Sequence, residues 1–585
     1  MQVTWYDLTE LINARIGGTM YLKFRVEIPK AAGVSRKKIK GTIYIYYEHG
    51  RKYKKDKKYT VSQCTSIGKQ CEDDPGYMYP NSNYLKFFPD AELPDDLPES
   101  SRSSCLKIGD YIVIKRVLEY YHLDSKIAEI VGKDYGLFLD LVAYVIVSEN
   151  NAAQYYPDYA YNHPLFTRGM KIFSDSKISD FLRSISRDQS IRFQNDWNRS
   201  RDQSEKIYIS YDSTNKHCQA GDIEIAEPGH EKDKQNKPIF NFSIAYDRNN
   251  RIPLFYEQYS GSINDVSQLQ YMLKKAAAYG YENAGFILDR GYFSEDNIRF
   301  MDRNGYEFII MVKGCKELVN ELVLKVRGTF EDEWKSTVPY YDVSGTTVRN
   351  PLFKADDRKR YVHIFYSDFK KAKEKTKLQE EIRRQKEYLE SMIGSKDPVD
   401  KRFSTYFDLI YYHEGKADQE LAFIREKQEE ISRALKLCGY FAIITSASMT
   451  AETALNLYKS RDDSEKLFRG DKSYLGERSM RVYHDESFFA KIFIEFVALI
   501  VRNKIYTLLK DRMKELHKKK NYMTVPAAMK ELDKIELIRQ ADGVYRLDHA
   551  VTATQKDILK AFNMTATSVK SEAELLGKML VDITG

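Results

Sequence analysis

The sequence predicts a multidomain α/β protein whose central part is a mixed-sheet core interrupted by an inserted domain. A chain of 585 residues is too long for a single hydrophobic core. From Lys206 onward, the hydrophobic pattern follows the order strand, strand, strand, helix, strand, helix, strand, which is typical of a mixed sheet. A long charged stretch then separates this series from a further strand and helix.

Two regions precede the predicted core. Residues 1–107 are β-rich, with GTIYIYYEHG as the clearest strand. Ten Lys or Arg lie between Arg36 and Lys58 against two acids, with several tyrosines among them. Such a segment is either a nucleic-acid surface or a solvated hairpin. Residues 108–203 show helical periodicity and are either a DNA-end-binding module or a scaffold.

The first part of the core is predicted over residues 204–314. KIYISYDSTN reads as a strand that ends at Asp212, and FNFSIAY and IPLFYEQ form a hairpin around DRNNR. A helix over 263–279 follows, then the short strand GFILD, a second helix starting near Ser294 and the strand YEFIIMVK. Most of these strands are apolar enough for a buried sheet.

The inserted domain is predicted over 315–437. It contains the short strands TTVRN and RYVHIFY and two charged helices, from Phe369 to Met392 and from Gln419 to Leu437. The second part of the core, 438–512, begins with the strand GYFAIITS. Helices from Ala451 to Phe468 and from Glu486 to Leu509 follow. Residues 513–585 form a C-terminal region for which we expect a role in dimerisation.

Composition narrows the class of protein. Hydrophobic residues at 42% and charged residues at 30% indicate an ordered chain, neither disordered nor fibrous. The net charge of +7 permits a polyanionic partner without requiring one. The six cysteines lack the spacing of a zinc site, and no signal peptide or membrane-spanning stretch is evident. We therefore expect a cytoplasmic protein without a membrane partner.

Three acidic residues stand where phosphodiester chemistry would need them. Two Mg²⁺ ions require several carboxylates that converge from rigid elements, because Mg²⁺ prefers oxygen ligands. Asp212 and Asp289 each follow a predicted strand, and Glu465 lies on the helix after the resumed strand. Aspartate is also a common turn residue, and helical glutamates are mostly solvated. The spacing alone leaves both interpretations open.

The motifs around these residues resemble a known family. Asp212-Ser213-Thr214 and Asp289-Arg290-Gly291 are similar to the core of bacterial insertion-sequence transposases, which have an RNase H-like catalytic domain. The resemblance covers about residues 200–510. The third motif is the most specific, because its residues match a Tyr-Arg-Glu-Lys signature with spacings of three, four and seven: Tyr458, Arg461, Glu465 and Lys472. Long charged helices in the insertion, and Asp462 after Arg461, depart from the family pattern.

The resemblance implies a mechanism. Asp212, Asp289 and Glu465 would bind two Mg²⁺ ions, for which Mn²⁺ can substitute. Phosphates of the DNA end would contact the other three signature residues: Tyr458, Arg461 and Lys472. The substrate would be double-stranded DNA, both the terminal inverted repeats of the transposon and the target, held by a homodimer on paired ends.

One aromatic residue of the insertion belongs to the same hypothesis. Relatives use their insertion to handle the DNA end, sometimes by stacking on a flipped base. Trp334 is the only tryptophan of the insertion and is the candidate for that contact. Its acidic neighbours, and the frequency with which tryptophan is buried, favour plain packing instead.

Three other functions are alternatives to a transposase. A simple RNase H-like nuclease would cut DNA without joining it, although the signature spacing argues against this. A non-catalytic DNA-binding protein derived from a transposase would not need all three carboxylates. A glycosidase with paired carboxylates would need neither the basic stretches nor the signature. One such stretch, Arg502 to Lys520, holds eight Lys or Arg against two acids and is either a DNA contact or an exposed helix face.

Overall fold

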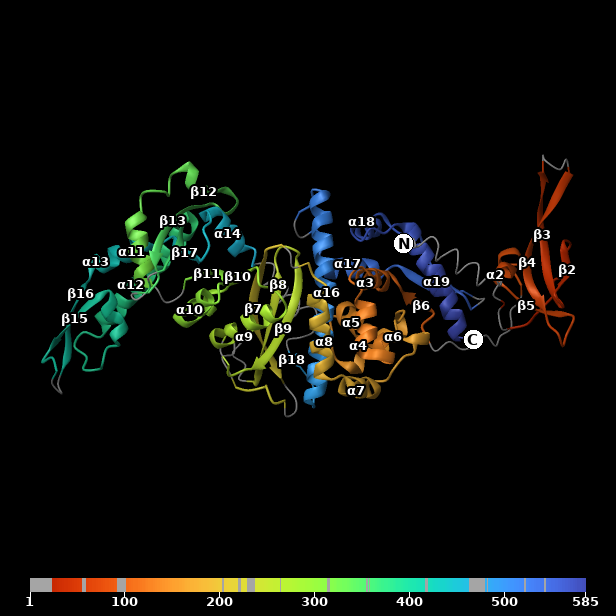
Figure 1. The fold of residues 1–585 in the computed structure, drawn as a ribbon, viewed down its shortest axis with the longest axis horizontal. Coiled ribbons are helices and arrows are strands. Elements are labelled where there is room, and N and C mark those ends of the chain that lie inside the picture. Colours follow the sequence, from red (N-terminus) through yellow and green to blue (C-terminus); the bar gives the residue numbers. More distant parts are fainter. Residues whose placement is uncertain are drawn as a thin grey trace. The chain divides into compact units, whose positions relative to one another are not determined.

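The computed structural model divides the chain into two compact units (Figure 1). One comprises 1–185 and 490–585, and the other comprises 186–489. The structure describes these residues: 21, 24–54, 59–91, 102–202, 205–218, 223–228, 237–263, 265–312, 316–353, 356, 358–415, 419–461, 479–480, 482–519, 522–540 and 543–584.

The first unit contains an antiparallel sheet built from the N-terminal region. Its strand order is β1-β5-β4-β3-β2, and it buries Ile45, Ile67 and Met78. β3 is rich in β-branched and aromatic residues, which favour the extended conformation of a strand. The elements are β1 (Val26–Glu27), β2 (Val34–Ile39), β3 (Thr42–Lys54), β4 (Tyr59–Gln70), β5 (Tyr77–Pro80) and α2 (Ser82–Phe87).

The helical region as far as residue 185, and the C-terminal region from residue 490, belong to this same first unit. A three-stranded sheet of order β20-β19-β6 joins them, with Leu106 paired to Leu537. The elements are β6 (Cys105–Lys107), α3 (Gly109–Tyr120), α4 (Leu123–Val131), α5 (Tyr135–Ser148), α6 (Tyr156–Asn162), α7 (Asp175–Ser184), α16 (Asp485–Glu515), α17 (Val525–Leu532), β19 (Glu536–Arg539), β20 (Tyr545–Leu547), α18 (Ala553–Ala561) and α19 (Ala566–Thr584).

The second unit is built on a ten-stranded mixed sheet, which confirms the predicted mixed α/β class. The order along the sheet is β12-β13-β14-β17-β11-β10-β7-β8-β9, and β18 pairs with the end of β7. Strands β7, β10 and β11 are parallel, whereas β8, β9 and β17 run antiparallel to their neighbours. All five residues of β10 are buried, as expected for a strand inside a parallel pair.

The strands of the second unit are β7 (Ile207–Cys218), β8 (Ile239–Asp247), β9 (Ile252–Ser260), β10 (Ala284–Leu288), β11 (Glu307–Met311), β12 (Thr337–Val338), β13 (Val343–Pro351), β14 (Lys359–Tyr366), β15 (Phe407–Tyr412), β16 (Glu420–Glu426), β17 (Tyr440–Thr445) and β18 (Ser479–Met480). Its helices are α8 (Arg187–Arg199), α9 (Asp265–Ala278), α10 (Glu295–Arg303), α11 (Lys316–Val326), α12 (Asp368–Ser391), α13 (Gln428–Leu437) and α14 (Ala451–Lys459).

Helix α8 is fixed to the sheet by one large side chain. A capping box between Ser186 and Gln189 starts the helix. Trp197 is fully buried, and its indole Nε1 donates a hydrogen bond to the carbonyl oxygen of Pro253 at 2.9 Å. The predicted hairpin of β8 and β9 is thereby braced by a helix that precedes it in the chain.

The stretch predicted as an insertion divides into two parts. Strands β13 and β14 join the main sheet, where β14 pairs with β17. Strands β15 and β16 instead form a separate hairpin with its own small core, which includes Leu389, Phe407 and Leu421. The predicted helix from Gln419 to Leu437 is wrong in its first half, because residues 420–426 pair with β15 as a strand.

No helix in the described part of the chain combines the length and the apolar character needed to cross a membrane.

A buried histidine makes the second unit sensitive to acid. His363 on β14 is fully buried, and its ring nitrogens share hydrogen bonds with the hydroxyl groups of Thr347 and Thr445, at 2.8 and 2.9 Å. Burial lowers the pKa of His363 from 6.5 to about 4. The folded state therefore binds fewer protons than the unfolded state between these two pH values.

We expect the stability that neutral His363 contributes to be present above pH 6.5 and lost as the pH falls toward 4. A shift of this size corresponds to about 3 kcal/mol of unfolding free energy. Urea unfolding at several pH values, followed by tryptophan fluorescence, measures it. His363→Gln should flatten the dependence, whereas His484→Gln, at an exposed position, should leave it unchanged. An equal slope in both variants contradicts the assignment.

Candidate active site

The central sheet brings two of the predicted acidic residues together. Strands β7 and β10 are parallel, and their last paired residues are Tyr211 and Leu288. Asp212 and Asp289 are the next residues in the same register. Neighbouring strands lie about 4.8 Å apart, and equivalent positions on parallel strands direct their side chains to the same face. The register therefore places Asp212 beside Asp289 along the two strands.

The two aspartates differ in their local setting. The predicted end of the first strand at Asp212 is wrong, because β7 continues to Cys218 through its pairing with β8. Asp212 accepts a hydrogen bond on Oδ1 from the backbone N–H of Ser213 at 2.9 Å. Asp289 follows the end of β10 and precedes a short 3₁₀ turn, so its side chain lies at the edge where β10 stops.

Helix α14 holds Tyr458, the first residue of the signature, near this edge. Thr450 caps its first turn by accepting a hydrogen bond from the N–H of Thr453. Tyr458 is buried, and its ring packs in a cluster that includes Ile287 of β10 and Leu455. The ring of Tyr458 is therefore part of the core between α14 and the sheet.

The predicted helix from Ala451 to Phe468 is too long in the described residues. Helix α14 ends at Lys459, and the hydroxyl of Ser460 donates to the carbonyl of Leu457 at 2.6 Å, which favours the end of the helix. Arg461 lies in the turn that follows, so it does not share a helix face with Tyr458. Its guanidinium still lies 5.5 Å from the centre of the Tyr458 ring.

An ion pair that the sequence analysis missed connects the signature to the aspartates. Arg461 Nη1 lies 3.1 Å from Asp289 Oδ1, and the exposed fractions of the two side chains are 13% and 35%. The spacing of residues in the sequence does not predict this contact, because the contact depends on where α14 packs against the sheet. The arginine supplies a positive charge where two carboxylates would otherwise repel each other.

Two predicted residues cannot be placed. Glu465 and Lys472 lie outside the residues that the structure describes. Trp334 is described, and its side chain is 85% exposed, so the expectation that it packs in a core is wrong. Its neighbour Glu333 is paired with Lys335 at 2.8 Å, which offsets one of the nearby acidic charges.

The donor set of Asp212 and Asp289 fits a divalent cation. Both offer carboxylate oxygens, which are the ligands that Mg²⁺ and Mn²⁺ prefer. Asp289 already attracts a cationic group in this structure, and its partial exposure gives access from solvent. A carboxylate pair of this kind can hold ions that act on a phosphate ester.

The chain was compared with known proteins. The sequence model of the family described as "Transposase DDE domain" matches residues 204–501. A search of curated proteins found no match. Among solved structures, one similar chain is described as "Cryo-EM structure of piggyBac transposase synaptic complex with hairpin DNA (SNHP)". The identity is 9% and the TM-score 0.37, over 72% of this chain and 79% of that chain.

We expect Arg461 to compete with divalent ions for Asp289. Removing the guanidinium in Arg461→Gln should tighten Mn²⁺ binding about fivefold, since a partly buried ion pair contributes about 1 kcal/mol. Electron paramagnetic resonance of free Mn²⁺ measures the affinity, and loss of the same signal change in Asp289→Asn identifies the site. Arg433→Gln, on the exposed face of α13, is the matched control. Unchanged or weaker binding in Arg461→Gln would refute the competition.

Proposed function

The chain belongs to the family of transposases with a DDE domain and is a DNA transposase, and from that premise we propose which residues carry its reaction. Asp212, Asp289 and Glu465 hold two Mg²⁺ ions, for which Mn²⁺ can substitute. The observation that supports this proposal is the register of β7 and β10, after which Asp212 and Asp289 follow as the next residues. The family match covers residues 204–501, a range that includes all three residues.

The proposed reaction has two steps at one site. Water first hydrolyses the phosphodiester at the transposon end, and the freed 3′-hydroxyl then attacks a phosphodiester of target DNA. Bound divalent ions would activate the attacking oxygen and neutralise the leaving one. Asp212 and Asp289 keep their oxygens in fixed positions because both are anchored by the sheet, and Glu465 completes the ligand set from the segment after α14.

The signature residues are proposed to orient the DNA. Arg461 lies beside Asp289, so a guanidinium released from this pair by metal binding can contact a phosphate of the transposon end. Lys472 adds a second positive charge. The ring of Tyr458 is buried, and we assign to it the support of Arg461, whose charge lies over that ring. We propose that the chain belongs to the transposases that carry the Tyr-Arg-Glu-Lys signature. We also propose that it comes from a bacterial insertion sequence and that its core is RNase H-like.

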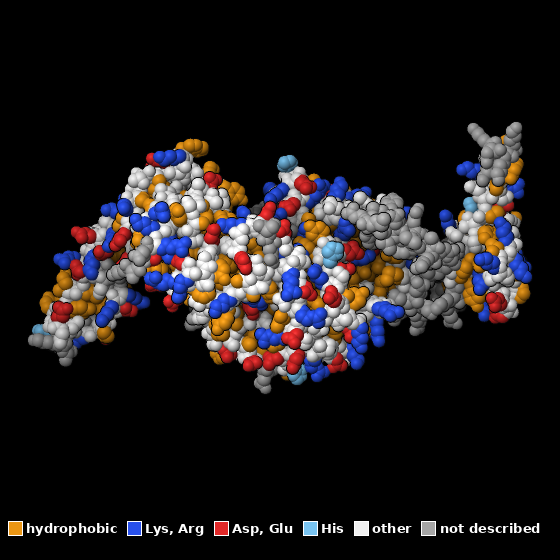
Figure 2. Space-filling view, viewed as in Figure 1, with side chains coloured by type: hydrophobic (Ala, Val, Ile, Leu, Met, Phe, Trp, Pro, Cys, Tyr) orange, Lys and Arg blue, Asp and Glu red, His pale blue; other side chains and the backbone are white. Residues whose placement is uncertain are grey.

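Basic surfaces outside the core are proposed to hold more of the DNA. Several Lys and Arg side chains, in blue, lie among hydrophobic ones on the visible face of the N-terminal sheet (Figure 2). Arg36, Lys37 and Lys38 are exposed on β2, and Lys37 lies 4.5 Å from the ring of Tyr46. We further propose a homodimer on paired ends, acting in the cytoplasm where bacterial DNA lies.

We expect Glu465→Gln to bind DNA but not to cleave it, because the neutral amide is a poor Mg²⁺ ligand of nearly equal size. The substrate is labelled DNA that carries the inverted repeats flanking the coding region. Gel shifts measure binding, and denaturing gels with Mg²⁺ separate cut from joined strands. Asp212→Asn and Asp289→Asn should behave alike, with cleavage reduced at least a thousandfold.

The matched control is Glu452→Gln, an exposed glutamate in the first turn of α14 that should keep full activity. Wild-type cleavage by Glu465→Gln would remove it from the ligand set. Cut but never joined strands from the unmodified protein would favour a nuclease without strand transfer. Binding without any cleavage would favour a non-catalytic relative.

Trp334 is proposed to stack on a base of the transposon end. Stacking contributes about 1–3 kcal/mol per base, so Trp334→Ala should weaken binding of labelled ends about tenfold while Trp334→Phe keeps most of it. Tyr412→Ala, at another exposed aromatic position, is the control. Equal affinity of Trp334→Ala and the unmodified protein in a fluorescence anisotropy titration would exclude this contact.

A further inference from the structure

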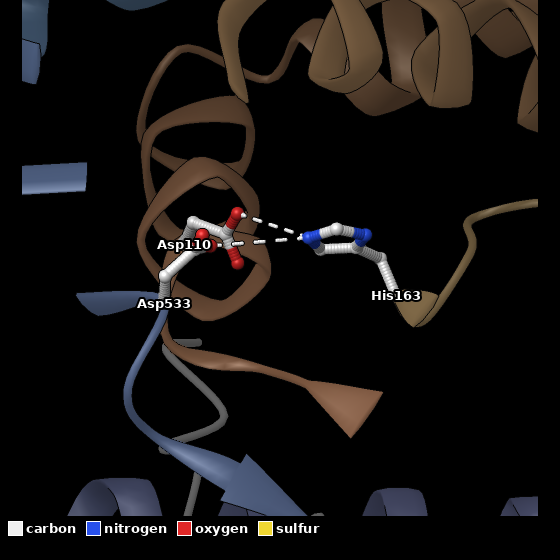
Figure 3. A group of neighbouring side chains, drawn as sticks. All are labelled: Asp110, His163 and Asp533. Carbon is white, nitrogen blue, oxygen red and sulfur yellow. Dashed lines mark ion pairs between the residues drawn. The ribbon is translucent and has the colours of Figure 1, made fainter. Parts of the chain in front are cut away.

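A second group of metal-ligating side chains lies in the first unit, outside the proposed catalytic residues. Asp110 is the second residue of α3, His163 follows α6, and Asp533 follows α17. One ligand atom from each lies within 4.8 Å of the others (Figure 3). His163 Nε2 is 3.7 Å from Asp110 Oδ2 and 3.9 Å from Asp533 Oδ1.

Each of the three side chains is held by a partner on its other polar atom. His163 Nδ1 lies 2.8 Å from the carbonyl oxygen of Tyr159, which fixes Nδ1–H as the donor. Asp110 Oδ1 accepts a hydrogen bond from the N–H of Tyr111 at 2.8 Å. Asp533 Oδ2 accepts one from Lys107 Nζ at 2.9 Å. The imidazole ring and the two carboxylates therefore have fixed orientations.

The atoms that face one another have no such partner. Asp110 Oδ2, His163 Nε2 and Asp533 Oδ1 are buried, and none of them has a partner within hydrogen-bond distance in the described part of the chain. A protonated His163 would form ion pairs with both carboxylates at 3.7 and 3.9 Å. Asp110 is fully buried and His163 is 8% exposed. A buried polar atom without a partner is costly, and three of them aimed at one point indicate a missing ligand.

We propose that Asp110, His163 and Asp533 form a site for a transition-metal ion of the Zn²⁺ class, with water as the fourth ligand. Two carboxylate oxygens and one imidazole nitrogen suit Zn²⁺ better than Mg²⁺, which prefers oxygen ligands in an octahedron. Ligand atoms around a tetrahedral Zn²⁺ lie about 3.4 Å apart. The observed separations of His163 Nε2 from the two carboxylates need to close by only a few tenths of an ångström.

Access from solvent agrees with this assignment. The two carboxylates carry two negative charges, of which Lys107 neutralises one from outside the group. A protonated His163 would balance the one that remains, whereas a divalent ion beside a neutral His163 would leave one net positive charge. Asp533 is 28% exposed, so an ion and one water ligand can enter from its side. The competing arrangement is a proton shared between His163 and Asp110. Burial raises the pKa of Asp110 to about 7.

The proposed ion would join parts of the chain that are far apart in sequence. It bridges the start of α3 and the end of α6 to the turn between α17 and β19, next to the pairing of β6 with β19. Its role is therefore to stabilise the first unit, and it does not depend on the assignment of the catalytic carboxylates.

The test uses the full-length protein with Asp289→Asn, which removes the proposed catalytic ion site. After treatment with a chelator, Zn²⁺ alone is titrated by calorimetry, and Co²⁺ is added to record the visible spectrum of a tetrahedral site. We expect one equivalent of Zn²⁺ to bind and to raise the Tm of unfolding. Adding His163→Gln should weaken Zn²⁺ binding at least a hundredfold and abolish the Tm shift.

His549→Gln is the matched control, because His549 also lies beside an aspartate, Asp548, but on the exposed surface. It should leave the Zn²⁺ affinity unchanged. Asp533→Asn is a second variant at a more exposed ligand and should weaken binding at least tenfold even where His163→Gln fails to fold. No Zn²⁺ binding, binding that survives both ligand variants, or a Tm that follows pH and ignores Zn²⁺ would overturn the proposal.

Discussion

The parallel pairing of β7 with β10 is the constraint on which the rest of the proposed site depends. Its register places Asp212, on β7, beside Asp289, the residue directly after β10. Residues fixed on strands keep their separation better than residues on mobile segments, which two-metal chemistry requires. Buried side chains such as Ile209 and Phe286 maintain that pairing from the interior of the sheet.

The sheet also explains why a third element can reach the aspartates. Helix α14 packs on it through Leu455 and Tyr458, which lie in one cluster with residues of β10, β11 and β17. Arg461 then meets Asp289 directly after the helix ends. The position of the Arg461 charge relative to Asp289 therefore depends on the hydrophobic packing of α14 against the sheet.

The local hydrophobic pattern of the sequence predicted most strands of the sheet. It predicted few of the features that depend on contacts between distant residues. The alternation in β7 and the apolar run of β10 indicate strands because their burial follows from sequence. Leu421 and Ile424 are three residues apart, as on a helix face, yet pairing with β15 makes them a strand. Resemblance supplied the signature, whereas the Arg461–Asp289 pair and the Asp110–His163–Asp533 group require knowledge of packing.

The pairing of β6 with β19 has a consequence for how the protein is made. More than four hundred residues separate these partners, and the whole second unit lies between them in the chain. During synthesis the second unit is complete before the first, so it can fold while the first unit still lacks its last strands. A nascent or C-terminally truncated chain would thus carry the aspartate pair on an enzyme whose other half is unfinished.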